Sequence, residues 1–460
     1  MPRVAIVTLG CPKNSIDSEG LGGILDAAGH SLTEDPAAAD VVLVNTCGFI
    51  DPARRETVQE VLDLAELKED GDLKGLVLTG CLVARSADEL AEALPEVDAL
   101  VDFAAYPRIA EIVDGAAGGT LVERVYGDPG TKFDPAYWDA TIAGGPRVRF
   151  GRAPWGYVKI AEGCDRGCTF CAIPLMRGKF RSRSIETIGS DARRLVAQGV
   201  TEISLVSQDS VMWGRDTKEG SLLDLLKSLE RIEGLRRLRL MYLHPQGVTD
   251  ELVDAMLGSD VVAPYFDLSL QHVSPRILRA MGRWGSRDRF TRMIDRIRER
   301  EPLAAIRSTF ILGFPGEEDD DAAEVESFVA DTALDWVGTF TYSPEEGTRS
   351  FHLDERVPEA VARERADRVT TVAEETMAER ARSLVGTRLE VLAERLDVPA
   401  GTWTGRSHRE APEVDGEITF TALDATRRTA SARRRDVAVG DYVDVLVTGS
   451  EGPELSGHLG

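Results

Sequence analysis

The sequence predicts an α/β protein with three folded regions: an N-terminal open parallel-sheet domain, a central partial (β/α)6 barrel and a small C-terminal antiparallel β-barrel. Two patterns in the chain lead to this prediction. Apolar runs alternate with helix-length segments up to about residue 380, as in parallel α/β folds. Beyond residue 387 the pattern changes to short strands between turn residues, expected at residues 389–393, 417–421 and 442–448, as in small barrels. The 460 residues, 43% of them hydrophobic, are enough for about three domains.

The predicted domains follow these changes of pattern. We expect the N-terminal domain at residues 1–105, the central domain at 151–382 and the C-terminal barrel at 383–460. Residues 106–150 contain many glycines and prolines, and we interpret them as a linker or as an excursion from the first domain. One amphipathic helix is expected over residues 361–384, where the chain leaves the central domain.

In the N-terminal domain, three cysteines follow three predicted strands at the same place. Cys11, Cys47 and Cys81 each come just after an apolar run, and the carboxyl ends of parallel strands lie along one edge of a sheet. A single cysteine in such a place is more often a small buried apolar residue than a ligand. Because the arrangement recurs in three strand–loop units, it predicts a three-thiolate metal site. The expected strands are residues 4–9, 41–44 and 76–78, with helices over 18–28 and 52–67.

The central domain carries a denser group of thiols, Cys164, Cys168 and Cys171, in the spacing Cys-x3-Cys-x2-Cys. Iron–sulfur clusters are usually held by four thiolates, so three from one loop leave one iron open to a small molecule. Structural zinc sites usually need four ligands in two separated pairs, and no second pair follows this triplet. The spacing therefore predicts a 4Fe–4S cluster with an open iron, and a zinc knuckle is the weaker alternative.

Six strand–helix units are expected in the central domain, and barrels of this kind build their sites at the carboxyl ends of the strands. The cysteine triplet follows the first strand, and polar groups follow the later ones. The expected strands are residues 157–161, 202–206, 238–243, 266–270, 306–312 and 336–342. The polar groups are Ser207, Gln208, Asp209, His244, Gln271, His272, residues 313–317 with Gly313, and residues 343–348. The glycines of 313–316 also fit a simple turn, and His272 also fits a core histidine.

The charge of the chain restricts its partners. There are 78 acidic and 54 basic residues, giving a net charge of −24, which favours a basic partner and opposes nucleic acid as the main substrate. Basic residues in the C-terminal barrel gather only at 427–435, so a protein partner is the easier one there too. A second basic cluster fits either a carboxylate-binding group or a solvated face: Arg177, Lys179, Arg181 and Arg183.

Cysteine usage and hydropathy indicate the compartment. Six cysteines are too few for a disulfide scaffold, and a reducing compartment would leave them as thiols for a metal. No apolar run approaches the roughly 18 residues of a membrane span. The N-terminus is typical of a first strand rather than a signal peptide. We therefore expect a cytoplasmic protein without a membrane partner.

These features resemble one enzyme family. The triplet, with Phe170 before its last cysteine, is similar to that of the radical S-adenosylmethionine (SAM) superfamily. The second triplet and the C-terminal barrel, which is TRAM-like, extend the resemblance to the methylthiotransferases over essentially the whole chain. The motifs resemble the RimO branch: residues 9–14 (Leu-Gly-Cys-Pro-Lys-Asn), 17–19 (Asp-Ser-Glu), 45–50 (Asn-Thr-Cys-Gly-Phe-Ile), 176–178 (Met-Arg-Gly), 207–209 (Ser-Gln-Asp), 342–348 (Tyr-Ser-Pro-Glu-Glu-Gly-Thr) and 411–416 (Ala-Pro-Glu-Val-Asp-Gly). The tRNA-modifying MiaB relatives typically show Gly-Cys-Gln-Met-Asn and Arg-Pro-Gly-Thr, which are absent here.

The resemblance implies a transferase that adds a methylthio group to the β-carbon of an aspartate in a small-subunit ribosomal protein, which is strongly basic. It implies two 4Fe–4S clusters: a SAM-cleaving one on Cys164, Cys168 and Cys171, and an auxiliary one on Cys11, Cys47 and Cys81. Two SAM molecules are used, one to methylate sulfur and one to supply a radical, because the protein itself cannot break an unactivated C–H bond by acid–base chemistry.

Further site residues and partners follow from the same resemblance. Phe170 is expected near the adenine of SAM, and Ser207, Gln208, Asp209 and Gly313 are candidate SAM-binding residues by position. The electron donor is expected to be a low-potential flavodoxin or ferredoxin. Two alternatives stay open: a tRNA adenosine methylthiotransferase of the MiaB type, and a non-catalytic iron–sulfur protein that docks on ribosomes.

Overall fold

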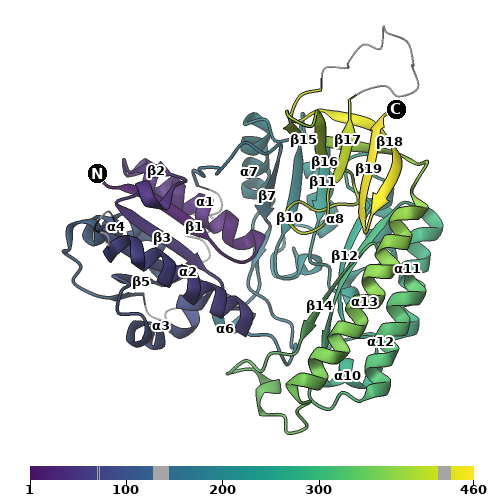
Figure 1. The fold of residues 1–460 in the computed structure, drawn as a ribbon, viewed down its shortest axis with the longest axis horizontal. Helices are drawn as coiled ribbons and strands as arrows, with labels where there is room; N and C mark the ends of the chain where they lie inside the picture. The colour runs from purple at the N-terminus through teal and green to yellow at the C-terminus, as the bar shows by residue number, and fades with distance from the viewer. Residues whose placement is uncertain (70, 72, 128–144, 423–436) are drawn as a thin grey trace.

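The computed structural model describes residues 1–69, 71, 73–127, 145–422 and 437–460. The N-terminal domain lies beside the mouth of a half-barrel, and the C-terminal barrel packs on the half-barrel's opposite side (Figure 1). This arrangement confirms the predicted α/β fold class and its three folded regions. Residues 128–144 of the linker expected at 106–150, and the basic stretch at 427–435, lie outside the described residues.

The N-terminal sheet is wholly parallel in its described part, in the order β2-β1-β3-β4-β5-β6. Residues 106–126, expected to lie in a linker or an excursion, form α4 and β6, and β6 pairs with β5. The sheet therefore continues past residue 105. The elements are β1 (Arg3–Thr8), α1 (Pro12–Ala27), β2 (Ser31–Thr33), β3 (Val41–Thr46), α2 (Asp51–Glu69), β4 (Gly75–Gly80), α3 (Cys81–Ala93), β5 (Ala99–Val101), α4 (Ile109–Gly118) and β6 (Val125–Tyr126).

The half-barrel contains the six predicted strands in parallel. Two three-stranded sheets, β11-β10-β7 and β12-β13-β14, meet through parallel bridges between Leu238 and Val262 and between Leu243 and Leu268. The strands are β7 (Trp155–Lys159), β10 (Glu202–Val206), β11 (Arg237–Leu240), β12 (Tyr265–Gln271), β13 (Ala305–Leu312) and β14 (Trp336–Thr341). Helices cover the outside: α7 (Ile185–Ala197), α8 (Leu222–Leu229), α9 (Asp250–Leu257), α10 (Pro275–Ala280), α11 (Arg287–Arg300) and α12 (Asp319–Thr332).

Short elements hold the loop of the second cysteine group, and one long helix leaves the half-barrel. The loop lies between β8 (Ala161–Glu162), which pairs with β9 (Arg181–Ser182), and α6 (Ile173–Arg177). The predicted exit helix is α13 (Glu359–Ser383), which runs along β14 and α12 towards the C-terminal barrel (Figure 1). Among the described residues, none of the helices has the length and apolar character to cross a membrane.

The C-terminal barrel is closed, in the order β15-β16-β17-β19-β18. We expected it to be antiparallel, but β17 and β19 run parallel. Strand direction cannot alternate around a closed ring with an odd number of strands, so at least one pair of the five must be parallel. The strands are β15 (Arg388–Asp397), β16 (Thr402–Arg406), β17 (Ile418–Thr421), β18 (Tyr442–Glu451) and β19 (Glu454–Leu459). Of these, β16 and β19 were not among the predicted strands.

The segment between β16 and β17 inserts into the interior of the half-barrel. The hydroxyl of Tyr157 donates to the carbonyl of Pro412 at 2.7 Å, and that of Tyr265 donates to Asp415 Oδ2 at 2.7 Å. Ala411 is fully buried in a cluster with apolar side chains of the half-barrel interior. This segment of the C-terminal barrel thus occupies part of the half-barrel interior, and its Val414 lines a cavity there.

Candidate functional site

One cavity brings the two cysteine groups together at the carboxyl ends of the strands. Its volume is about 420 Å³, and residues of the N-terminal domain, the half-barrel and the C-terminal barrel line it. All six cysteines of the chain contribute to its wall: Cys11, Cys47, Cys81, Cys164, Cys168 and Cys171. The sheet topology therefore gathers three residues that are far apart in the sequence, as predicted from their places after strands. Their role as cluster ligands stays a prediction.

Local backbone geometry orients the three N-terminal cysteines, Cys11, Cys47 and Cys81, towards the cavity. Cys11 is the N-cap of α1 and Cys81 is the first residue of α3, so both thiols lie at helix N-termini, where the helix dipole favours a thiolate. Gly10 and Gly80 precede them with φ of 95°, which other residues rarely adopt. A Cβ on Gly10 would lie 2.7 Å from Cβ of Cys47 and would displace that side chain.

The donor set of each cysteine group fits an iron–sulfur cluster, because such clusters take cysteine thiolates as ligands. In the described part of the chain, no three His, Cys, Asp or Glu side chains converge on one ion. A cubane spreads its protein ligands over different irons, so each thiol group can be wider than a single-ion site. Burial raises the pKa of Cys164 and of Cys81 to about 11 and that of Cys171 to about 12. Bound iron would supply the positive charge that these buried thiols need to ionise.

Around Cys164 and Cys168 the cavity wall carries polar atoms without partners. Arg283 Nη1 donates to Cys168 Sγ at 3.2 Å, and Arg166 Nε donates to Asp209 Oδ2 at 2.5 Å. Several buried atoms of these wall residues have no hydrogen-bond partner within the described structure: Asp209 Oδ1, Gln208 Oε1, Arg166 Nη2 and Arg283 Nε. Buried polar atoms are normally satisfied, so this wall fits a polar ligand such as SAM.

Around the N-terminal cysteines a buried ion network joins two domains. Arg177 donates from Nε to Cys81 Sγ at 3.2 Å and forms ion pairs of 3.0 Å with both Asp17 and Glu162. Lys159 reaches the same two carboxylates at 2.6 and 2.8 Å. Because Asp17 lies on α1 and the cations belong to the half-barrel domain, the network fixes the N-terminal cysteines relative to the barrel mouth.

Lys13 crosses the same boundary from α1. Its Nζ donates to the carbonyl of Ser207 at 3.3 Å and lies 3.3 Å from the ring centre of Tyr242. Burial lowers the pKa of Lys13, although Cys11 nearby opposes that shift. The ammonium group therefore forms part of the cavity wall beside the N-terminal cysteines.

Only some of the predicted SAM-binding residues line the cavity. Phe170, Gln208 and Asp209 line the cavity, whereas Ser207 and Gly313 do not. The hydroxyl of Ser207 accepts from the amide of Asp209 at 3.1 Å, and the amide of Gly313 donates to Glu317 at 2.9 Å. These two residues shape the loops behind the wall, and the SAM-binding role of all five stays a prediction.

The other polar residues predicted to follow the strands also differ in whether they line the cavity. His244 and Gln271 line the cavity, whereas His272 is fully buried and accepts from the Ser274 amide through Nδ1. Glu345 of the stretch after β14 lines the cavity and pairs with Arg54 and Arg85 of the N-terminal domain.

The four residues of the predicted basic cluster, Arg177, Lys179, Arg181 and Arg183, do not gather at one site. Arg177 lines the cavity, Arg183 is buried against Asp191, and Lys179 and Arg181 are exposed. The cluster therefore presents neither a single carboxylate-binding group nor a uniformly solvated face.

The cavity residues to which the sequence reasoning assigned no role include Lys13, Arg283, Arg307 and Val414. Lys13 lies two positions after a candidate ligand and within the motif of residues 9–14, and these are its sequence signals. Arg307 lies on β13, where its inward direction follows from strand alternation once the strand is known. Val414 reaches the cavity from another domain, and no local pattern indicates that.

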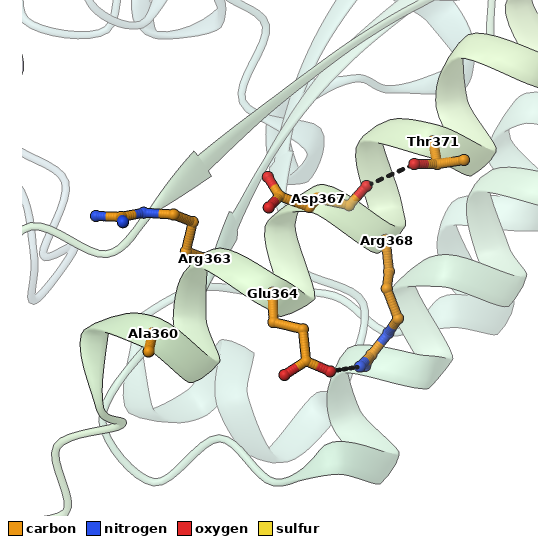
Figure 2. A pocket seen from close by; sticks show the side chains of 6 residues that line it. All are labelled: Ala360, Arg363, Glu364, Asp367, Arg368 and Thr371. Carbon is orange, nitrogen blue, oxygen red and sulfur yellow. Dashed lines mark hydrogen bonds and ion pairs between the residues drawn. The ribbon is translucent and has the colours of Figure 1, made fainter.

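A second hollow, of about 410 Å³, lies on the outer face of α13 (Figure 2). Within it, Arg368 donates to Glu364 at 3.2 Å, and the hydroxyl of Thr371 donates to the carbonyl of Asp367 at 3.0 Å. These are ordinary contacts between successive turns of one exposed helix. The hollow is lined by Ala360, Arg363, Glu364, Asp367, Arg368 and Thr371, which all belong to α13, and we assign it no function.

Three family profiles match the chain in the order of its domains. Residues 3–102 match Uncharacterized protein family UPF0004, residues 158–329 match the Radical SAM superfamily, and residues 385–459 match the TRAM domain. Radical SAM proteins use SAM and a 4Fe–4S cluster, which agrees with the central cysteine triplet.

Solved structures support the fold. The radical SAM methyltransferase TsrM from Kitasatospora setae, solved with cobalamin and a 4Fe–4S cluster, has a TM-score of 0.54 and 16% identity. The comparison covers 84% of this chain and 80% of TsrM. The cobalamin-dependent SAM radical enzyme OxsB has a TM-score of 0.50 and 13% identity, with coverage of 81% and 56%. At these identities the likeness concerns the fold alone.

Curated relatives are much closer in sequence, and each is named ribosomal protein uS12 methylthiotransferase RimO. The protein from Kineococcus radiotolerans is 41% identical, covering 98% of this chain and 96% of its own. Those from Symbiobacterium thermophilum and Heliobacterium modesticaldum are 40% and 41% identical over 99% of this chain, and over 90% and 95% of their own. With three matching domains and relatives of this similarity over nearly its full length, the chain belongs to the RimO family of radical SAM methylthiotransferases.

Proposed function

We propose that this enzyme adds a methylthio group to the β-carbon of an aspartate of ribosomal protein uS12, using SAM and two 4Fe–4S clusters. The observation that carries the proposal is the single cavity lined by both cysteine groups. Sulfur insertion into an unactivated C–H bond needs a radical source and a sulfur source within reach of one substrate atom. The uS12 substrate in the names of the relatives supports the choice of target.

Each cysteine group has a distinct part. Cys164, Cys168 and Cys171 would hold the cluster that reduces SAM, and Cys11, Cys47 and Cys81 would hold the auxiliary cluster. When bound, these groups and two SAM molecules supply the methyl group, the sulfur and the 5′-deoxyadenosyl radical that removes the β-hydrogen. The rest of the chemistry is positioning, which the protein's own side chains provide.

The chain's residues bind and orient the reactants. We assign Phe170, Gln208 and Asp209 to SAM, because they line the wall beside the central triplet. Ser207 and Gly313 support that wall from behind through their hydrogen bonds with Asp209 and Glu317. The buried ion pairs between the N-terminal domain and the half-barrel keep the two thiol groups at a fixed separation and exclude water from that boundary.

The partners follow from charge and substrate. A net charge of −24 suits a basic ribosomal protein. We propose a cytoplasmic location, where ribosomal proteins are assembled, and a low-potential flavodoxin or ferredoxin as the electron donor. The MiaB-type alternative is disfavoured by this charge and by the names of the relatives. A non-catalytic docking protein would not need two groups of three cysteines, each of which leaves one iron without a protein ligand.

Mass spectrometry tests the proposal. Anaerobically reconstituted enzyme would be incubated with SAM, a strong reductant and a sulfur source, with uS12 and bulk tRNA in parallel. We expect methylthio-aspartate in uS12 and unmodified tRNA. The Cys47→Ala variant should lose this product yet still form 5′-deoxyadenosine, whereas Cys168→Ala should lose both. Methylthio-adenosine in tRNA without modified uS12 would move the chain to the tRNA-modifying branch.

A further inference from the structure

The cavity contains two cations without a carboxylate partner. Five basic side chains line it, and three of them form ion pairs: Arg166 with Asp209, Arg177 with Asp17 and Glu162, and Arg307 with Asp267 and Asp415. Lys13 and Arg283 have no carboxylate within ion-pair distance in the described part of the chain. A buried ammonium group without an ion pair is costly, so Lys13, which is 7% exposed, marks a place where an anionic ligand is expected.

The two unpaired cations lie beside different cysteine groups. Arg283 donates to Cys168 Sγ at 3.2 Å and to the carbonyl of Ser269, which ties it to the SAM side of the cavity. Lys13 lies two residues after Cys11, on the side of the auxiliary cysteines. A substrate that receives sulfur from that side therefore meets Lys13 first.

Strained backbone holds the partner of Lys13 in place. Tyr242, whose ring lies under the ammonium group, has a φ of 60°, an unusual value for a bulky residue. Its amide donates to Asp267 Oδ2 at 2.9 Å, and its carbonyl accepts from the amide of Ser210. Such strain persists only where the surroundings fix it, and it is common at ligand sites. The Tyr242 ring thereby sets the position of the ammonium group.

The ammonium group keeps capacity for one more acceptor. It has three N–H donors; one reaches the carbonyl of Ser207 at 3.3 Å, and the aromatic ring covers a second direction. A carboxylate is the acceptor that would also balance the charge.

We propose that Lys13 binds the side-chain carboxylate of the target aspartate and so selects aspartate over uncharged residues. The inference rests on the proposed function and adds a specificity-determining residue to it. Holding the carboxylate on the auxiliary side places the adjacent β-carbon between the two cysteine groups, and the same contact gives a neutral asparagine no ionic partner.

Binding measurements test this role. Reconstituted enzyme would be titrated anaerobically, by fluorescence anisotropy, with labelled uS12 peptides that carry Asp or Asn at the position modified by the wild type. We expect the wild type to prefer Asp by about ten- to a hundredfold, as for hydrogen bonds to charged groups. Lys13→Met should bind both peptides equally while keeping its iron content, and Lys13→Arg should retain part of the preference. The control is Lys74→Met, which removes an exposed lysine paired with Asp40 in the same domain.

The outcomes separate the two proposals. If Lys13→Met keeps the preference for Asp, the carboxylate binds elsewhere and the assignment is wrong. If the variant loses iron from the auxiliary cysteines, Lys13 serves to balance the cluster charge instead, and the assignment is again wrong. A wild type that forms methylthio-aspartate in either case leaves the proposed function intact. Failure of the wild type to modify uS12 at all would contradict the proposed function itself.

Discussion

At the scale of single residues, Glu202, the first residue of β10, is a carboxylate shared by three arginines. It accepts from Arg406 at 2.8 Å, from Arg237 at 3.1 Å and from Arg239 at 3.4 Å, and it is fully buried. Burial alone would raise its pKa, but the three guanidinium groups outweigh burial and lower the pKa to about 2. Glu202 therefore links the half-barrel to the C-terminal barrel through charge rather than through apolar contact.

This carboxylate makes stability depend on acid pH. Its pKa is lower in the folded chain than the ordinary 4.5, so its contribution is complete above pH 4.5 and is lost as pH falls towards 2. Glu202→Gln should cost about 3–5 kcal/mol at pH 7, because three buried guanidinium groups lose the carboxylate that they share, and only Arg406 and Arg237 keep a second one, Glu394 and Glu390. The difference from wild type should shrink below pH 4.5.

Thermal unfolding midpoints of both proteins between pH 7 and pH 3 measure this effect. Glu417→Gln is the matched control, because Glu417 forms an exposed pair with Arg395 in the same barrel. A constant gap between wild type and Glu202→Gln across this range would show that folding does not lower the pKa of Glu202.

At the scale of elements, the segment 411–416 makes the C-terminal barrel part of the cavity wall. Val414 lines the cavity, and Asp415 holds Arg307 Nε at 3.2 Å in its wall. Burial raises the pKa of Asp415 to about 6, even though Arg307 and the Tyr265 hydroxyl oppose this shift. The segment thus depends on its hydrogen bonds to remain in the half-barrel.

Removing one of these hydrogen bonds should loosen the segment. Tyr265→Phe deletes the hydroxyl that donates to Asp415 Oδ2, which should cost about 1–3 kcal/mol of local stability. Amide hydrogen exchange at Val414 and Asp415 should become about tenfold faster or more. Tyr126→Phe in the N-terminal domain is the control. Unchanged exchange at these amides would mean that apolar packing of Ala411 alone retains the segment.

The same elements show what the sequence could predict. The strand expected over residues 202–206 is β10 with those bounds, because Ile203, Leu205 and Val206 form an apolar run typical of a buried parallel strand. The short strands β16 and β19 lack such a run, and the burial of 411–416 depends on another domain. Cys11, Cys47 and Cys81 were predicted from their positions after strands, and Cys164, Cys168 and Cys171 from their spacing. Lys13 and Arg307 were not, because a lone basic residue carries no sign of the partner that it faces.

At the scale of the whole molecule, we expect the net charge and the exposed aromatic side chains at the cavity rim, Phe49 and Phe340, to contribute to substrate binding in different ways. The net charge of −24 acts over distance, whereas exposed aromatic side chains at the cavity act on contact. Phe49 and Phe340 line the cavity and are 38% and 47% exposed, unusually high for such large apolar groups. They come from the N-terminal domain and from β14, so both domains would touch a loop that enters.

This division predicts the salt dependence of binding. The charges are screened within about 10 Å at 0.1 M salt and within about 3 Å at 1 M. The association rate with basic uS12 should therefore fall about tenfold or more between about 50 and 500 mM salt, as for other complexes whose association is electrostatically steered. The dissociation rate should change little, because it depends on the desolvated contacts of the cavity and its rim. Stopped-flow association and dissociation of labelled uS12 measure both rates, with SAM binding as the control that lacks a large charge. An association rate that stays constant with salt would mean that the acidic surface faces away from the approach of the substrate, and that the aromatic rim alone captures it.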